Sequence, residues 1–106
     1  MDQLAMKFQQ ELVDKMYRAK KECNYNPTRF NQMLARYGAI DTAKRLINES
    51  IRTGNPSDGF TTLFLCGRLD LTMEDSVCDP QYAGFFSKEE IAQCKRLLGR
   101  AYERTV

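Results

Sequence analysis

Residues 86–102, FSKEEIAQCKRLLGRAY, carry the most complete helix signal in the sequence. Ser87 and Glu90 form a strict Ser-x-x-Glu capping box, in which each side chain satisfies the free backbone amide of the other residue. Phe86 and Ile91 occupy the two positions of a hydrophobic staple around this box. Apolar residues then recur with the period of an α-helix, at Ile91, Cys94, Leu97, Leu98, Ala101 and Tyr102. We therefore predict a last helix that begins at Ser87 and runs to about Glu103.

Three helices are predicted in the first half of the chain. The first runs from about Asp2, a suitable N-cap, to Cys23. The Asn26-Pro27 pair predicts the start of the second helix, with Asn as the cap and Pro in the first turn, and Gly38 predicts its end. A third helix follows almost at once. The predicted inward-facing residues of the first helix are Leu4, Phe8, Leu12, Met16 and Ala19 or Cys23. Those of the second are Phe30, Met33, Leu34 and Tyr37, and those of the third are Ile40, Ala43, Leu46, Ile47 and Ile51.

Two short helices are predicted between a polar loop at residues 52–59 and the last helix. Residues 60–66 are apolar on nearly every side, which favours a buried helix capped by Ser57 or Asp58, with a β-strand as the alternative because of the Phe and Thr content. Residues 72–75, Thr-Met-Glu-Asp, form an imperfect capping box. They predict a helix of about two turns that ends before Asp79-Pro80.

The 106 residues are therefore predicted to form a single all-α domain, residues 1–106. We expect a compact bundle of about six helices, in which long first and last helices bracket four short ones. The hydrophobic and charged fractions, 42% and 28%, are typical of a globular protein. No apolar run approaches the roughly 20 residues that span a bilayer, so we expect no membrane segment and a cytoplasmic location.

The sequence offers little for catalysis or metal binding. It contains no histidine, which excludes His-based catalytic triads and most zinc sites. The four cysteines lack a Cys-x-x-Cys pair and are expected to be reduced thiols that pack as small hydrophobic residues, although a four-cysteine zinc site is an alternative. Glu74, Asp75 and Asp79 could serve as paired carboxylates or bind a divalent cation, but helix N-termini favour acids in any case. We expect no enzymatic activity, no cofactor and no resident metal.

Two segments are candidates for binding a partner protein. Residues 79–86 form an aromatic connection in which Tyr82, Phe85 and Phe86 could face a partner or plug the core. In the second segment, residues 67–72, Arg68 and Asp70 alternate with leucines across a tight corner. Arg68 and Asp70 could form a buried pair that fixes the corner. Alternatively, Arg68 could belong to an anion- or peptide-binding notch near the helix starts at Ser57 and Thr72.

Nucleic-acid binding is the second functional hypothesis. The second and third predicted helices meet at Gly38, as in a helix-turn-helix. Lysine and arginine side chains contact phosphates, and asparagine can read adenine. The candidate residues on these two helices and the loop after them are Arg29, Arg36, Lys44, Arg45, Asn48 and Arg52.

The strings at residues 26–30, 43–47, 58–63, 67–74 and 86–90 together resemble a family of small uncharacterised bacterial proteins. Gly67-Arg68-Leu69-Asp70-Leu71-Thr72 is the most specific part of the likeness. The resemblance carries no known activity and implies a compact bacterial domain, and small proteins of this kind often belong to mobile or defence-related loci. Our leading hypothesis is a non-enzymatic helical interaction module from a bacterium or phage, which acts by protein binding.

Overall fold

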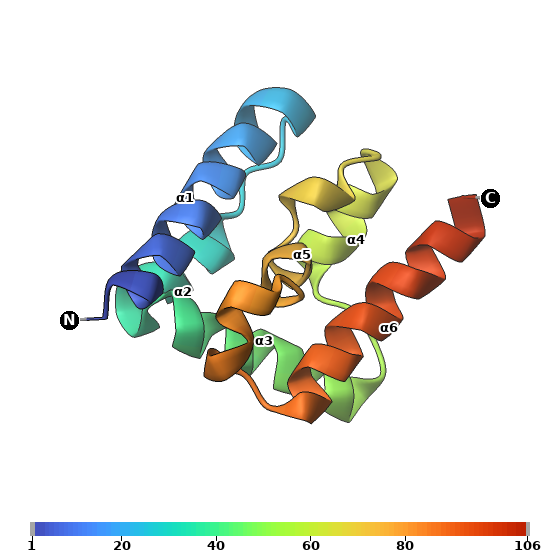
Figure 1. Ribbon diagram of the computed structural model, residues 1–106. Coiled ribbons are helices and arrows are strands. Elements are labelled where there is room, and N and C mark those ends of the chain that lie inside the picture. Colours follow the sequence, from blue (N-terminus) through green and yellow to red (C-terminus); the bar gives the residue numbers. More distant parts are fainter. Residues whose placement is uncertain (1, 106) are drawn as a thin grey trace.

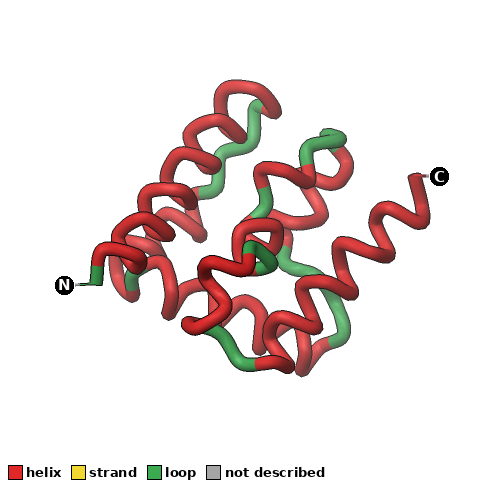
Figure 2. The backbone as a smooth tube through the Cα atoms, in the orientation of Figure 1, coloured by secondary structure: helices red, strands yellow, loops and turns green. Residues whose placement is uncertain are grey.

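The computed structural model describes residues 2–105, and side chains are described for residues 2–99. In this range it contains helices and loops but no strand (Figure 2). The elements are α1 (Gln3–Cys23), α2 (Thr28–Tyr37), α3 (Ala39–Thr53), α4 (Asp58–Leu65), η1 (Leu69–Leu71), α5 (Met73–Val77), η2 (Pro80–Phe85) and α6 (Lys88–Thr105), where η marks a short 3₁₀-helix. The prediction of an all-helical protein with long first and last helices is confirmed. The predicted inward positions Ala101 and Tyr102 lie outside the described side chains.

Four predicted helix starts are confirmed by their caps. Asp2 accepts a hydrogen bond from the amide of Leu4, and Thr72 accepts one from the amide of Asp75. Ser57 caps α4 in the same way, which excludes the strand alternative for that segment. The capping box before α6 is complete, since the Ser87 amide donates to Glu90 at 2.8 Å and the Glu90 amide donates to the Ser87 hydroxyl at 3.1 Å.

Three details differ from the prediction. Helix α3 has 15 residues, so it is a long helix rather than a short one. Asn26 does not cap α2. The N-cap position is occupied by Pro27 instead, and no side chain makes a capping hydrogen bond there. The aromatic connection is not an irregular loop, because the Asp79 side chain caps a 3₁₀-helix that begins at Pro80.

Helices α1 and α6 lie on opposite sides of the molecule, with α4 and α5 between them (Figure 1). Helix α3 packs against both α1 and α6 and so joins the two sides. Helix α2 follows α1 through a short connection and packs on α3, from which Gly38 separates it. Gly38 has a φ of 81°, a conformation that a side-chain-bearing residue rarely adopts, so the glycine permits this tight junction.

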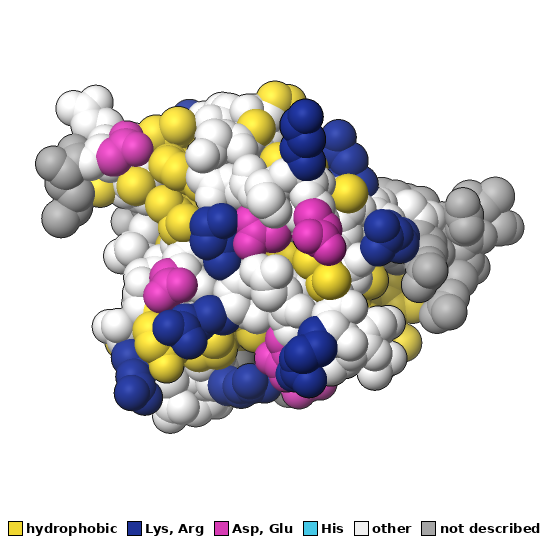
Figure 3. Space-filling view, turned by 90° about the horizontal axis from the view of Figure 1, so that it is seen from below, with side chains coloured by type: hydrophobic (Ala, Val, Ile, Leu, Met, Phe, Trp, Pro, Cys, Tyr) yellow, Lys and Arg dark blue, Asp and Glu magenta, His cyan; other side chains and the backbone are white. Residues whose placement is uncertain are grey.

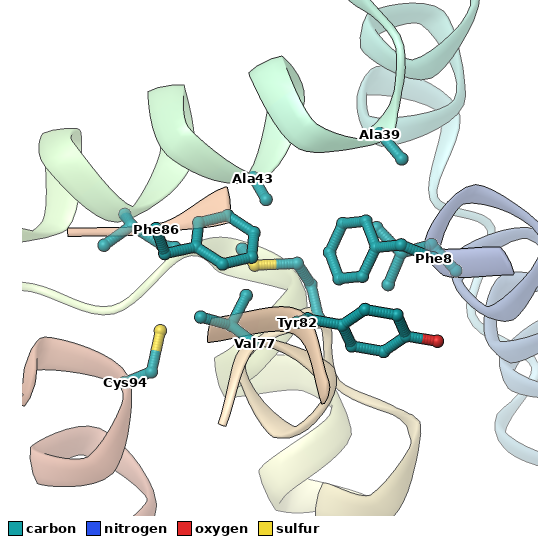
Figure 4. Packing of buried hydrophobic residues seen from close by; sticks show 10 residues of the cluster. Phe8, Ala39, Ala43, Val77, Tyr82, Phe86 and Cys94 are labelled. Carbon is teal, nitrogen blue, oxygen red and sulfur yellow. The ribbon is translucent and has the colours of Figure 1, made fainter. Parts of the chain in front are cut away.

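The main core contains an aromatic cluster beneath α3. Figure 4 shows the rings of Phe8, Tyr82 and Phe86 together, below Ala39 and Ala43 of α3. The Phe8 ring meets the Tyr82 ring edge-on at a centroid distance of 4.9 Å. The small alanines let α3 approach these rings closely, so the cluster fixes α1, α3 and η2 relative to one another.

Candidate functional site

A pocket of about 510 Å³ opens between α2, the end of α3 and the start of α4. Ligand pockets in proteins usually have volumes of about 300–1,000 Å³. We refer to it as the α2–α4 pocket. It is lined by Met16, Tyr25, Asn26, Thr28, Arg29, Phe30, Met33, Leu46, Glu49, Ser50, Thr53, Asn55, Pro56, Ser57, Asp58, Gly59, Phe60, Leu63, Thr72, Met73 and Glu74.

Glu74, in the first turn of α5, places a buried carboxylate in this lining. The residue is 3% exposed, and one of its carboxylate oxygens accepts a hydrogen bond from the Ser57 hydroxyl at 3.3 Å. Burial raises the pKa of the Glu74 carboxyl group to about 7, although its own backbone amide and Ser57 favour the charged form. Near neutral pH this carboxylate is therefore poised between its two protonation states.

The positive charge that acts on Glu74 belongs to Lys15, whose ammonium group binds other partners. The Lys15 ammonium donates to the Thr72 carbonyl at 3.0 Å and pairs with Asp75 at 3.2 Å. Its charge makes the smallest of the contributions that shift the pKa of Glu74. Among the described side chains, no salt bridge reaches Glu74, so its charge lacks a direct counter-ion.

The rim of the α2–α4 pocket carries further acidic groups. Asp58 is exposed at the start of α4, and Glu49 on α3 lies 3.6 Å from the guanidinium group of Arg29. Burial, together with the charges of Asp58 and Glu74, raises the pKa of the Tyr25 phenol. The lining thus holds three carboxyl groups against one basic side chain, which gives the pocket an acidic character.

The walls of the α2–α4 pocket are apolar. Phe60 and Leu63 are buried at its base, and Phe30, Met33 and Leu46 are half-buried around it. Phe30 also packs on the two core clusters that contain Leu12 and Leu63, so this wall is held by the interior rather than by surface contacts.

A disulfide joins the end of α1 to the residue after α4. Cys23, at the end of α1, is bonded to Cys66, just after α4, with a Cα–Cα distance of 6.1 Å. The prediction that all four cysteines are reduced and pack as small hydrophobic residues is wrong for this pair, because the fold brings the ends of α1 and α4 together. Cys94 is buried and Cys78 is half-buried, and both are free thiols.

Arg68 ties the corner that follows the disulfide. Its guanidinium group donates to both carboxylate oxygens of Asp70, at 3.0 and 3.1 Å, and also binds Glu22. These hydrogen bonds lower the pKa of the Asp70 and Glu22 carboxyl groups. Arg68 and Asp70 therefore hold each other as one interpretation expected, but at the surface rather than buried. Arg68 is not among the residues that line the α2–α4 pocket, although Ser57 and Thr72 are.

The aromatic residues before α6 belong mainly to the core. Tyr82 and Phe86 are 0% and 7% exposed, and the Tyr82 hydroxyl donates to Glu11 at 3.0 Å. Phe85 is half-buried against the same cluster. The interpretation of Tyr82 and Phe86 as partner-facing side chains is wrong, because the η2 helix turns both rings inward under α3.

The basic candidates on α2 and α3 make intramolecular contacts. Lys44 and Asn48 both donate to the buried Glu90, at 2.8 and 2.7 Å. Arg45 pairs with Asp41 and lies over the Tyr37 ring, which Arg36 also approaches. Arg29 pairs with Glu49, and Arg52 is exposed. Figure 3, which views the molecule from below, shows basic and acidic side chains interspersed on that face.

The predicted acid cluster does not converge. Glu74 faces the α2–α4 pocket, Asp75 pairs with Lys15, and Asp79 caps η2. Within the described side chains, no group of three or more cysteine, aspartate and glutamate residues is arranged to hold a metal ion.

Among residues 2–105, no helix has both the length and the apolar character needed to cross a bilayer.

Glu74 is a buried carboxylate that the sequence analysis did not identify as such. Its neighbours on the helical face, at positions three before and three and four after it, are Leu71, Val77 and Cys78. An acid on the apolar face of a helix is the signal of a buried carboxylate. The convergence of Glu74 with Ser57 and Phe30 depends on tertiary packing, which no local pattern reveals.

Comparisons of the chain with protein-family models, curated proteins and solved structures found no match.

Proposed function

We propose that this protein is a non-enzymatic interaction module that acts by binding another protein, with the α2–α4 pocket as the place that receives the partner. The observation that carries the proposal is the pocket itself, a space of about 510 Å³ with apolar walls and a few convergent polar groups. Partner recognition usually depends on a few side chains that enter such desolvated pockets, surrounded by a polar rim.

The pocket is better suited to this role than the other candidate surfaces. Tyr82 and Phe86 are buried in the core, and the Arg68 guanidinium group is paired with Asp70 and Glu22. Intramolecular partners also engage most of the basic candidates for nucleic-acid binding, including Lys44 and Arg45. Within the described side chains, no salt bridge engages the Glu74 carboxylate that lines the α2–α4 pocket.

Selection of peptides from a random display library on the immobilised protein tests the proposal. A Thr53→Trp variant places a bulky ring at the rim, because Thr53 is exposed and lines the pocket. Thr62→Trp is the matched control, since Thr62 is an exposed helical threonine outside the lining. We expect selected peptides to bind the wild type and Thr62→Trp but not Thr53→Trp. Peptides that bind all three proteins equally would exclude the pocket as the binding surface.

The expected cytoplasmic location conflicts with the Cys23–Cys66 disulfide, so the state of this bond in cells tests that part of the proposal. Disulfides persist mainly in oxidising compartments, and most cytosolic thiols are kept reduced. Thiol alkylation of acid-quenched cells distinguishes the two states. A cytoplasmic protein is expected to be alkylated at Cys23 and Cys66, and protection of both would place it in an oxidising compartment.

A further inference from the structure

We infer that the partner inserts a basic side chain, lysine or arginine, into the α2–α4 pocket, where its charge pairs with the carboxylate of Glu74. The inference rests on the proposed function and specifies the chemistry of the residue that is recognised. Three independent features of the pocket support it: a buried carboxylate without a counter-ion, an acidic rim and aromatic walls.

The first feature is the uncompensated carboxylate. A buried ionised group is costly unless it is paired and hydrogen-bonded. Glu74 is 97% removed from solvent, and its side-chain partner is the neutral Ser57 hydroxyl. The ionised form of Glu74 therefore lacks a paired cation among the described side chains. An inserted ammonium or guanidinium group supplies that cation and also donates hydrogen bonds to the carboxylate oxygens.

The second feature is the sign of the charge around the opening. Asp58 and Glu49 stand at the rim, and the one basic side chain of the lining, Arg29, is drawn to Glu49. An anionic group entering the pocket would meet Asp58 and Glu74 without a free cation among the lining residues. A cationic group is attracted by the acids at the rim and then by Glu74 inside the pocket. The electrostatic potential therefore favours a positive charge from the opening to the interior.

The third feature is the fit to a long side chain with a charged end. Lysine and arginine have apolar stems, which favour contact with apolar walls while the charged group finds polar partners. Phe30, Met33 and Phe60 offer such walls, and the Tyr25 ring adds an aromatic face beside the carboxyl groups. Aromatic faces also attract cations directly. A short neutral polar side chain can donate a hydrogen bond to Glu74 but supplies neither a positive charge nor an apolar stem.

The test is a double-mutant cycle on a peptide whose binding requires the pocket, as judged by its loss in Thr53→Trp. The basic residue of the peptide is replaced by norleucine, which keeps the stem and removes the charge, and Glu74 is replaced by Gln. We expect the norleucine change to weaken binding to the wild type by about tenfold or more, and binding to Glu74→Gln by less than about threefold. This difference is the signature of direct pairing between the two charges.

Asp58→Asn provides a second variant that does not disturb the interior, because Asp58 is exposed. Asp41→Asn is its matched control, since Asp41 is also an exposed acid in the first turn of a helix but lies outside the pocket. We expect weaker binding of the basic peptide to Asp58→Asn than to Asp41→Asn, with the binding of the norleucine peptide unchanged by either.

The outcomes separate the inference from the function on which it rests. Pocket-dependent peptides that lack a basic residue, or whose norleucine forms bind equally well, overturn the inference and leave the proposed function standing. A library that yields no pocket-dependent peptide overturns both. If Glu74→Gln fails to fold, equal binding of the basic peptide to Asp58→Asn and Asp41→Asn overturns the inference.

Discussion

The Ser57 hydroxyl group joins the start of α4 to the buried carboxylate of Glu74. It accepts a hydrogen bond from the Phe60 amide at 3.2 Å and donates one to a Glu74 oxygen at 3.3 Å. One small side chain thus satisfies a helix end and a buried acid together. Ser57 caps α4 and Glu74 lies in α5, so this contact also couples the loop before α4 to α5.

Replacement of Ser57 by Ala is expected to destabilise the protein by about 1–2 kcal/mol, because it removes an N-cap and leaves Glu74 without its side-chain donor. It should also raise the pKa of Glu74 further. Chemical denaturation measures the first effect. Ser57→Thr keeps the hydroxyl group and is the control, and equal stability of Ser57→Ala and the wild type would contradict the assigned contact.

Glu74 is expected to make stability fall with rising pH. Its pKa is raised from 4.5 to about 7 in the folded protein, so the folded state binds the proton more tightly than the unfolded state. The resulting stabilisation is fully present below pH 4.5 and is lost as the pH rises to about 7. The stability of the wild type relative to Glu74→Gln should therefore decrease across this window by an amount on the order of 3 kcal/mol. Denaturation of both proteins at several pH values measures the difference, and a constant difference would disprove the shift.

Glu90 is expected to behave in the opposite way. Burial alone raises the pKa of this carboxyl group, but hydrogen bonds from Lys44, the Ser87 amide and Asn48 outweigh it and the pKa is lowered. Its contribution to stability is therefore present above the ordinary pKa of 4.5 and lost as the pH falls below it. Glu90→Ala should destabilise the protein by about 2–3 kcal/mol at neutral pH. The exposed Glu89 is the matched control, and Glu89→Ala is expected to change stability by less than about 0.5 kcal/mol.

The Cys23–Cys66 bond is expected to contribute about 4 kcal/mol in the chain-entropy description, given a sequence separation of 43 residues. Dithiothreitol should lower the melting temperature of the wild type and leave that of Cys66→Ser unchanged. Thermal melts with and without the reductant provide the measurement. A melting temperature of the wild type that does not respond to reductant would show that the bond does not form in solution.

The nucleic-acid hypothesis is tested by a gel shift with a plain duplex. Lys44 and Arg45 are paired with Glu90 and Asp41, so we expect no retarded band at about 100 mM salt, where weak phosphate contacts are screened. A band that is lost in Lys44→Ala/Arg45→Ala, with a shallower dependence on salt, would support the nucleic-acid alternative instead.

Local signals in the sequence predicted the elements well because helix ends depend on a few neighbouring residues. The caps at Asp2, Ser57, Thr72 and Ser87 each use a side chain that reaches an amide two or three residues away. Asn26 has a suitable side chain but does not cap α2, because the helix begins one residue later and Pro27 occupies the N-cap position.

Contacts between distant segments could not be predicted from these local signals. Cys23 and Cys66 offered no close pair to suggest a bond, and the fold alone brings them together. The sequence left open whether Tyr82 and Phe86 face a partner or plug the core, because it did not show that η2 lies under α3. The α2–α4 pocket is likewise built from α1, α2, α3, α4 and α5, so its existence depends on how these helices pack.

The disulfide also has a mechanical consequence. It closes residues 24–65, which hold all of α2, α3 and α4, into a covalent loop. If the chain is pulled from residues 3 and 99, tension passes directly from Cys23 to Cys66 and bypasses that loop. The 42 enclosed residues, between Cys23 and Cys66, represent roughly 150 Å of extended chain that stays hidden until the bond is reduced. Since the loop contributes most of the α2–α4 pocket, the oxidised protein keeps the pocket-forming helices within one closed length of chain while its ends are drawn apart.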